Sequence, residues 1–149
     1  MAELSIREMT IDDVEEVHDL DEKCFSSPWT KHIYYREVKD NHFAHYFVIE
    51  KDEVIIGYFG LWIVADDAQI TNIAVLPQYR GYGIGKHAFG FAMQYAIQEG
   101  AAQLSLEVRI SNTVAQKMYE SFGLKKGGIR KEYYPDNKED AYVMWVNLI

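Results

Sequence analysis

Three glycines alternate along one stretch of the chain, at Gly81, Gly83 and Gly85, and a lysine follows them directly. The apolar run at residues 70–76 precedes them and is typical of a strand, because Pro77 closes it. After the glycines, apolar residues recur at the spacing of one helix face: Phe89, Ala92, Met93 and Ala96. Glycine lets a ligand approach the backbone, and the first N–H groups of a helix lack internal partners at the positive end of its dipole. The order strand, glycine-rich loop, helix therefore predicts a phosphate-binding site.

Two common phosphate-binding motifs fit this stretch poorly. A P-loop requires Gly-x-x-x-x-Gly-Lys-Ser/Thr, but Gly81 lies one residue too close to Gly85, and His87 stands in place of the hydroxyl residue. The dinucleotide pattern Gly-x-Gly-x-x-Gly/Ala is met by Gly83, Gly85 and Ala88, yet too little chain follows to build the remaining strands of a dinucleotide fold. A plain glycine-rich turn would leave the regular spacing unexplained. A different phosphate ligand is therefore expected.

The elements around this stretch predict a single α/β domain over residues 1–149. Strands are expected near residues 4–7, 46–49, 54–64, 70–76, 104–108, 127–134 and 141–148. Helices are expected over residues 11–25, 29–40 and 113–122, and from the glycine-rich stretch to Gly100. The inward face of the helix at 113–122 is expected to consist of Val114, Ala115, Met118, Tyr119 and Phe122. Hairpins join some neighbouring strands and a crossover helix joins one pair, which indicates a mixed sheet.

Length, charge and cysteine content exclude several classes of protein. The 149 residues, 48% of them hydrophobic, are enough to bury one core. The net charge of −8 argues against direct binding of nucleic acid and favours a basic substrate. No segment reaches the roughly 18 apolar residues of a membrane span, and the N-terminus lacks a secretory signal. Cys24 is the single cysteine, which excludes an internal disulfide and suits the cytoplasm; it is expected to be a small buried residue rather than a nucleophile. The sequence does not determine the oligomeric state, and a monomer is compatible with it.

A third phosphate motif, Arg/Gln-x-x-Gly-x-Gly/Ala, is met by Arg80, Gly83 and Gly85. A second register of it is met by Gln78, Gly81 and Gly83. The stretch thereby resembles the pyrophosphate loop of the GCN5-related N-acetyltransferases (GNAT superfamily). Further segments resemble one branch of that superfamily, the RimI-type ribosomal-protein-alanine N-acetyltransferases, so that the similarity covers nearly the full chain. These segments are Phe25-x-x-Pro28-Trp29, Leu106-Glu107-Val108-Arg109, Ser111-Asn112, Ala115, Tyr119-Glu120-Ser121-Phe122-Gly123, Arg130, Tyr133-Tyr134-Pro135 and Glu139-Asp140-Ala141.

The resemblance implies a central, mostly antiparallel sheet with one parallel pair, flanked by helices, and acetyl-coenzyme A (acetyl-CoA) as the acetyl donor. The segment Ile73-Ala74-Val75 would hydrogen-bond the pantetheine arm as an added strand does. Asn112 has two interpretations: it caps the helix that follows, or it turns its side chain toward the coenzyme. The five histidines show no metal-ligand spacing with cysteine or carboxylates, so no metal is expected. The resemblance places the pyrophosphate on the backbone N–H groups of Arg80, Gly81, Tyr82, Gly83, Ile84, Gly85 and Lys86.

Two residues are candidates for the chemistry of acetyl transfer, which needs a base for the amine and an acid for the leaving thiolate. Glu107 interrupts the apolar strand at 104–108 and is the candidate base, although an alternating strand would also place it on the exposed face. The resemblance places Tyr119 beside the coenzyme sulfur as the candidate acid. Its position on the apolar face of its helix also suits an ordinary core residue.

The resemblance implies that the acceptor is the N-terminal alanine of a small-subunit ribosomal protein, protein eighteen. An aromatic and acidic groove is expected for its basic N-terminal peptide. It consists of Trp29, Tyr133 and Tyr134 together with Glu132, Asp136, Glu139 and Asp140. The alternative interpretation of the segment at 133–140 is an ordinary solvated hairpin. Two other functions stay open: acetylation of another protein N-terminus or a small amine, and binding of acyl-CoA without catalysis. The presence of both Glu107 and Tyr119 counts against the second of these.

Overall fold

The computed structural model describes residues 4–25 and 28–149, which form one seven-stranded sheet. Its strands are β1 (Leu4–Glu8), β2 (Ala44–Lys51), β3 (Val54–Val64), β4 (Asp67–Val75), β5 (Gln103–Arg109), β6 (Lys125–Arg130) and β7 (Ala141–Asn147). The spatial order is β1-β2-β3-β4-β5-β7-β6, and all neighbouring strands are antiparallel except β4 and β5. The expected α/β fold, with a mostly antiparallel sheet and one parallel pair, is confirmed.

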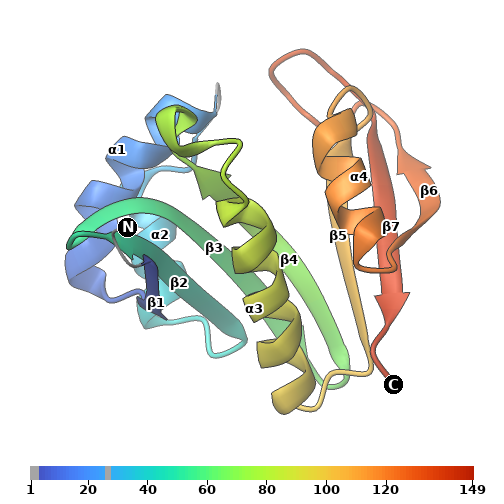
Figure 1. Ribbon diagram of the computed structural model, residues 1–149, viewed down its shortest axis with the longest axis horizontal. Coiled ribbons are helices and arrows are strands. Elements are labelled where there is room, and N and C mark those ends of the chain that lie inside the picture. The colour runs from blue at the N-terminus through green and yellow to red at the C-terminus, as the bar shows by residue number, and fades with distance from the viewer. Residues whose placement is uncertain (1–3, 26–27) are drawn as a thin grey trace.

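The helices cover the two faces of the sheet. α1 (Val14–Cys24) and α2 (Lys31–Lys39) lie on one face of the half formed by β1 to β4, and α3 (Ile84–Gln98) lies on the other face of that half (Figure 1). α4 (Thr113–Ser121) lies beside β5 and β7 (Figure 1). Two 3-10 turns, Ile11–Asp13 and Pro77–Tyr79, precede α1 and α3. α3 is the crossover that a parallel pair of strands requires. None of the helices in the described ranges is long and apolar enough to cross a membrane.

The parallel strands separate soon after they meet. β4 and β5 pair over only three positions, from Asp67↔Gln103 to Gln69↔Ser105. Beyond these pairs β4 stays paired only with β3, and β5 stays paired only with β7. The two strands therefore diverge (Figure 1). The register between β3 and β4 shifts at Thr71, and such a bulge bends and twists a strand. The sheet therefore opens between β4 and β5.

Two expected element boundaries were wrong. The helix expected over residues 29–40 begins at Lys31, because the side chain of Thr30 accepts the Ile33 N–H and caps it. The strand expected to reach residue 134 ends at Arg130, and the two tyrosines at 133 and 134 lie in the loop before β7. Aromatic residues favour strands, but these two lie beyond the last pair of the β6–β7 ladder.

The expected inward face of α4 needs one correction. Val114 is 81% exposed, and the buried position next to it is taken by a polar residue, Gln116. The Gln116 amide nitrogen donates to the carbonyl oxygens of Arg109 at 2.8 Å and Ile110 at 2.9 Å. A buried amide is tolerated when its hydrogen bonds are made. These two bonds fix the start of α4 to the end of β5.

Candidate active site

A cavity of about 620 Å³ lies where β4 diverges from β5, and we name it the loop cavity. The end of β4, the glycine-rich stretch and one face of α4 surround it. Among the residues that line it are Ile73, Ala74, Val75, Arg80, Gly81, Gly83, Ile84, Gly85, Lys86, Asn112, Met118 and Tyr119. The structure thus brings together all the residues predicted to bind the coenzyme except Tyr82, which is exposed outside the lining.

The glycine-rich stretch has the backbone geometry that an anion needs. Gly81 and Gly83 have positive φ angles of 86° and 80°, and a Cβ added at either would meet nothing within 4 Å. Backbone conformation, rather than crowding by the protein, therefore requires glycine here. Gly83 is the cap residue of α3, a helix of 15 residues whose first N–H groups have no partner within the helix. Open space beside these N–H groups at the positive end of the helix dipole fits a pyrophosphate.

The end of β4 turns backbone groups toward the same cavity. The Leu76 N–H donates to Ile56 O on β3 at 2.9 Å, and peptide groups alternate in direction along a strand. Those of Ile73 and Val75 therefore face away from β3 and toward the opening. Arg80 Nε donates to Val75 O at 2.9 Å, which ties the glycine-rich stretch to the strand. An extended ligand arm would pair with this edge as an added strand does.

Cys24, the last residue of α1, also borders the loop cavity. Its Sγ lies 3.5 Å from Val75 O, and the residue is half-buried rather than fully buried as expected. Burial raises the pKa of the Cys24 thiol. A thiol with a raised pKa stays protonated near neutral pH, so Cys24 is a poor nucleophile.

A second cavity, of about 450 Å³, adjoins the first, and we name it the carboxylate cavity. It shares Phe25, Ile73, Arg109, Asn112 and Tyr119 with the loop cavity. The rest of its wall includes one carboxylate of β5 and aromatic residues from the α1–α2 and β6–β7 connections. They are Glu107, Trp29, Tyr133 and Tyr134. Ligands in the two cavities would meet in the opening between β4 and β5.

Glu107 does not occupy a solvated position on its strand. Its side chain is 10% exposed and pairs with Arg130, whose Nε lies 3.1 Å from Glu107 Oε1. Gln69 Nε2, on the neighbouring strand β4, donates to the two carboxylate oxygens at 3.4 and 3.2 Å. These contacts hold the carboxylate at the wall of the cavity, where it can accept a proton directly or through water.

Tyr119 is both a core residue and a potential proton donor. The residue is 5% exposed, and its ring packs on Phe89 with 5.0 Å between centroids. Burial, with a smaller contribution from Tyr134, raises the pKa of the Tyr119 phenol above its ordinary value of 10.0. In the described ranges no side chain or backbone group hydrogen-bonds its hydroxyl. The hydroxyl therefore stays protonated at neutral pH and is available to donate to a ligand.

Of the two interpretations of Asn112, the structure shows the helix cap. Its side-chain oxygen accepts the Ala115 N–H at 3.2 Å and caps α4. The residue also borders both cavities. A contact from its amide nitrogen to the coenzyme remains a prediction.

The aromatic part of the predicted acceptor groove comes together around the carboxylate cavity. Tyr133 and Tyr134 pack edge to face with 5.0 Å between ring centroids, and Trp29 lies on the same cavity from the other side. The Arg109 guanidinium stacks on the Tyr134 ring at 4.0 Å. Burial raises the pKa of Tyr134 to about 12, so its hydroxyl is neutral at physiological pH.

Of the acidic residues predicted for the groove, Asp136 lines the carboxylate cavity, whereas Glu139 and Asp140 have other contacts. Glu139 pairs with Arg109 at 3.2 Å and accepts the Ser111 N–H at 2.8 Å, and the hydrogen bonds from Ser111 lower its pKa to about 2. Asp140 accepts the Glu132 N–H at 2.8 Å. Neither carboxylate lines either cavity. Both stabilise the loop that carries the two tyrosines, and a contact with substrate stays a prediction.

A buried carboxylate that the sequence analysis missed lies at the wall of the carboxylate cavity. Asp21 on α1 is 1% exposed and accepts hydrogen bonds from the hydroxyls of Tyr34 and Tyr58, the latter at 2.6 Å. Asn72 Nδ2, next to the bulge in β4, donates to the Tyr58 hydroxyl at 3.3 Å. This network connects α1, α2 and β3 to the divergent part of β4. The spacing of Asp21 in its helix does not indicate that it is buried, because the tyrosines that bind it are far away in the sequence.

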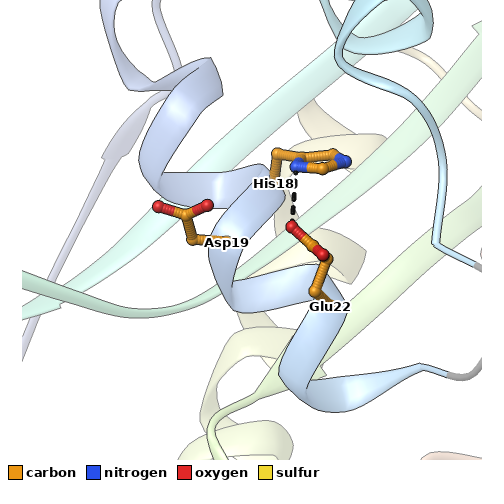
Figure 2. A group of neighbouring side chains, drawn as sticks. All are labelled: His18, Asp19 and Glu22. Carbon is orange, nitrogen blue, oxygen red and sulfur yellow. Dashed lines mark ion pairs between the residues drawn. The ribbon is translucent and has the colours of Figure 1, made fainter.

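One group of potential metal ligands lies on α1, away from both cavities. His18, Asp19 and Glu22 come from neighbouring turns of the helix, and His18 Nδ1 lies 3.2 Å from Glu22 Oε1 (Figure 2). The i, i+4 spacing of His18 and Glu22 differs from the expectation that the histidines have no metal-ligand spacing with carboxylates. Exposed acidic groups of this kind commonly serve solvation and helix stability.

The geometry agrees with a comparison against protein-family models. The model described as Acetyltransferase (GNAT) family matches residues 14–124, a span that contains both cavity-forming strands and the glycine-rich stretch. The chain belongs to the GNAT family. It is an acetyl-CoA-dependent N-acetyltransferase, and acetyl-CoA fits the loop cavity, because that cavity offers both an anion site and a free strand edge.

Known proteins resemble the chain over almost its full length. A protein of Bacillus subtilis (strain 168), provisionally named a ribosomal protein bS18-alanine N-acetyltransferase, is 50% identical over 97% of this chain and 95% of its own. A Haemophilus influenzae protein with the name ribosomal protein bS18-alanine N-acetyltransferase is 35% identical over 89% of this chain and 90% of its own. The crystal structure of the ribosomal-protein-S18-alanine N-acetyltransferase from Escherichia coli superposes with a TM-score of 0.91 and is 26% identical in sequence. The superposition covers 98% of this chain and 94% of that chain.

Replacing Gly83 by alanine should weaken coenzyme A binding by about tenfold or more, a free-energy change of about 1.4 kcal/mol. The added Cβ would occupy the space beside the backbone N–H groups, and the positive φ angle would be strained. Gly100→Ala is the matched control, because Gly100 also has a positive φ of 90° with nothing within 4 Å of an added Cβ, but lies at the far end of α3. The two variants should lose similar amounts of thermal stability. Calorimetry should nevertheless show weaker coenzyme binding only in Gly83→Ala. Equal coenzyme affinity in the two folded variants would contradict the assignment.

Proposed function

We propose that the protein acetylates the α-amino group of the N-terminal alanine of ribosomal protein bS18. The main support is that Tyr119, a potential acid, lines both cavities, and that Glu107, a potential base, lines the adjoining carboxylate cavity. The names of the Bacillus subtilis, Haemophilus influenzae and Escherichia coli relatives supply the identity of the acceptor. The similarity to them covers the cavities as well as the rest of the fold.

A weak base is sufficient to deprotonate the acceptor when that acceptor is a peptide N-terminus. An α-amino group has a pKa of about 7.7–8.0, whereas a lysine side chain has one of about 10.4. A carboxylate such as Glu107 can take up the amine proton through a water molecule near neutral pH. Acetyl-CoA, when bound, supplies an activated thioester. Tyr119 then returns a proton to the departing sulfur, and its raised pKa keeps that proton in place until negative charge develops there.

Two features of the carboxylate cavity favour a basic peptide as the acceptor. Aromatic side chains at Trp29, Tyr133 and Tyr134 surround the place where the first residue would lie. The net charge of −8 attracts a cationic chain from a distance, an effect that salt screens over about 8 Å at physiological ionic strength. Free lysine and polyamines would leave the aromatic wall uncovered and present amines of higher pKa.

The acceptor can be tested with a panel of peptides. Peptides that begin with alanine and continue with basic residues should gain one acetyl group at the N-terminus, located by fragmentation in a mass spectrometer. The same peptide with a blocked N-terminus, free lysine and spermidine should remain almost unmodified. Faster acetylation of the small amines than of the peptides would contradict the proposal and favour a small-molecule acetyltransferase.

The two candidate catalytic residues should respond differently to pH. Tyr119→Phe should lower kcat by about 10²–10⁴-fold at every pH, which is the usual contribution of a general acid. Glu107→Gln should lower kcat most below about pH 8 and recover at higher pH, where the amine is already neutral. Tyr142→Phe, on a half-buried tyrosine of β7, is the control and should keep wild-type activity. A loss below tenfold in Tyr119→Phe, or a pH profile of Glu107→Gln parallel to that of the wild type, would remove that residue from the mechanism.

A further inference from the structure

A third cavity, of about 490 Å³, lies between α2 and β3 outside the site described above, and we name it the α2 cavity. Its lining combines apolar and charged side chains. The lining residues are Trp29, Ile33, Arg36, Glu37, Asp40 and Trp62 together with Asn41. Neither catalytic candidate contributes to it.

The α2 cavity is continuous with the acceptor side of the active site. Trp29 lines both the α2 cavity and the carboxylate cavity. Trp62 on β3 pairs directly with Gln69 on β4, so their side chains project from the same face of the sheet. The Gln69 side chain in turn donates to Glu107. A chain that leaves the carboxylate cavity past Trp29 therefore reaches the α2 cavity along one face of the sheet.

A hydrogen-bonded network connects residues of the two cavities and holds one carboxylate in place. Trp62 Nε1 donates to Glu37 Oε1 at 2.7 Å, and the Tyr46 hydroxyl donates to the same oxygen at 3.1 Å. The Tyr46 hydroxyl also lies 3.1 Å from the hydroxyl of Thr71, a residue of the carboxylate cavity at the bulge of β4. The position of Glu37 is thus coupled to the geometry of the acceptor side.

The charges around the α2 cavity favour a cation. Glu37 and Asp40 contribute two carboxylates, against the single guanidinium of Arg36. Asp40 is the residue that ends α2, so the negative end of the helix dipole adds to its charge. The exposed indole of Trp62 offers an aromatic face on which a guanidinium or ammonium group can stack.

We infer that the α2 cavity binds a cationic side chain of the acceptor peptide, downstream of the acetylated residue. This inference rests on the proposed function, because it assumes that a peptide enters the carboxylate cavity by its N-terminus. The basic side chain stacks on Trp62 and pairs with Asp40 and Glu37, while the peptide backbone passes Trp29. The cavity thereby selects among peptides that share the same first residue.

The test uses peptides that share an N-terminal alanine and a neutral sequence and carry one arginine at successive positions. With the wild-type protein, arginine at a position beyond the second should lower KM by about two- to fivefold, as expected for a partly exposed charge pair. Asp40→Asn and Glu37→Gln should abolish this preference, so that the KM of the arginine peptides rises to that of the neutral peptide. Asp52→Asn makes the same change of charge in the turn between β2 and β3, at the opposite end of β3 from Trp62, and should keep the preference.

The outcomes separate this inference from the proposed function. If alanine peptides are acetylated but arginine does not lower KM at any position, the α2 cavity does not bind a peptide side chain. The proposed function would then stand without this inference. A preference that persists in both Asp40→Asn and Glu37→Gln would also overturn the inference. If no alanine peptide is acetylated while small amines are, the proposed function fails and the inference fails with it. Asp40→Asn alone suffices if Glu37→Gln does not fold, because Asp40 is exposed.

Discussion

Hydrogen bonding between β4 and β5 stops after three residue pairs, and the active site depends on that interruption. A sheet normally satisfies the backbone groups of its inner strands, and unpaired buried groups cost free energy. Here the peptide groups of Ile73 and Val75 face the opening instead of a neighbouring strand. A ligand that pairs with them completes the sheet. The same opening admits a second ligand from the carboxylate cavity, so donor and acceptor can meet inside the fold.

The polar groups of the site come from separate elements and are held by specific partners. Glu107 belongs to β5 and is held by Gln69 of β4, whereas Tyr119 belongs to α4. Gln116 joins α4 to the end of β5 through two backbone carbonyls. Arg109, at that same end of β5, stacks on Tyr134. The relative position of the candidate acid and base is therefore determined by packing between elements, and side chains that never touch substrate contribute to it.

Local sequence patterns predicted the features that local physics controls. The alternating glycines indicated an anion site, and the structure adds that Gly81 and Gly83 have positive φ angles. Features that depend on distant partners escaped prediction. Periodicity favoured Val114 over Gln116 as a buried residue, because the carbonyls that satisfy the Gln116 amide lie on another element. Nor did local patterns indicate that Glu139 pairs with an arginine 30 positions earlier in the sequence.

Amide hydrogen exchange at the end of β4 tests most directly whether the interrupted sheet receives the coenzyme. The Ala74 N–H faces β3 and serves as an internal reference, whereas the N–H groups of Ile73 and Val75 face the opening. On addition of coenzyme A, exchange at Ile73 and Val75 should slow markedly while exchange at Ala74 changes little, because only the free edge gains hydrogen bonds. Unchanged exchange at Ile73 and Val75 under conditions where calorimetry shows saturated binding would contradict the account.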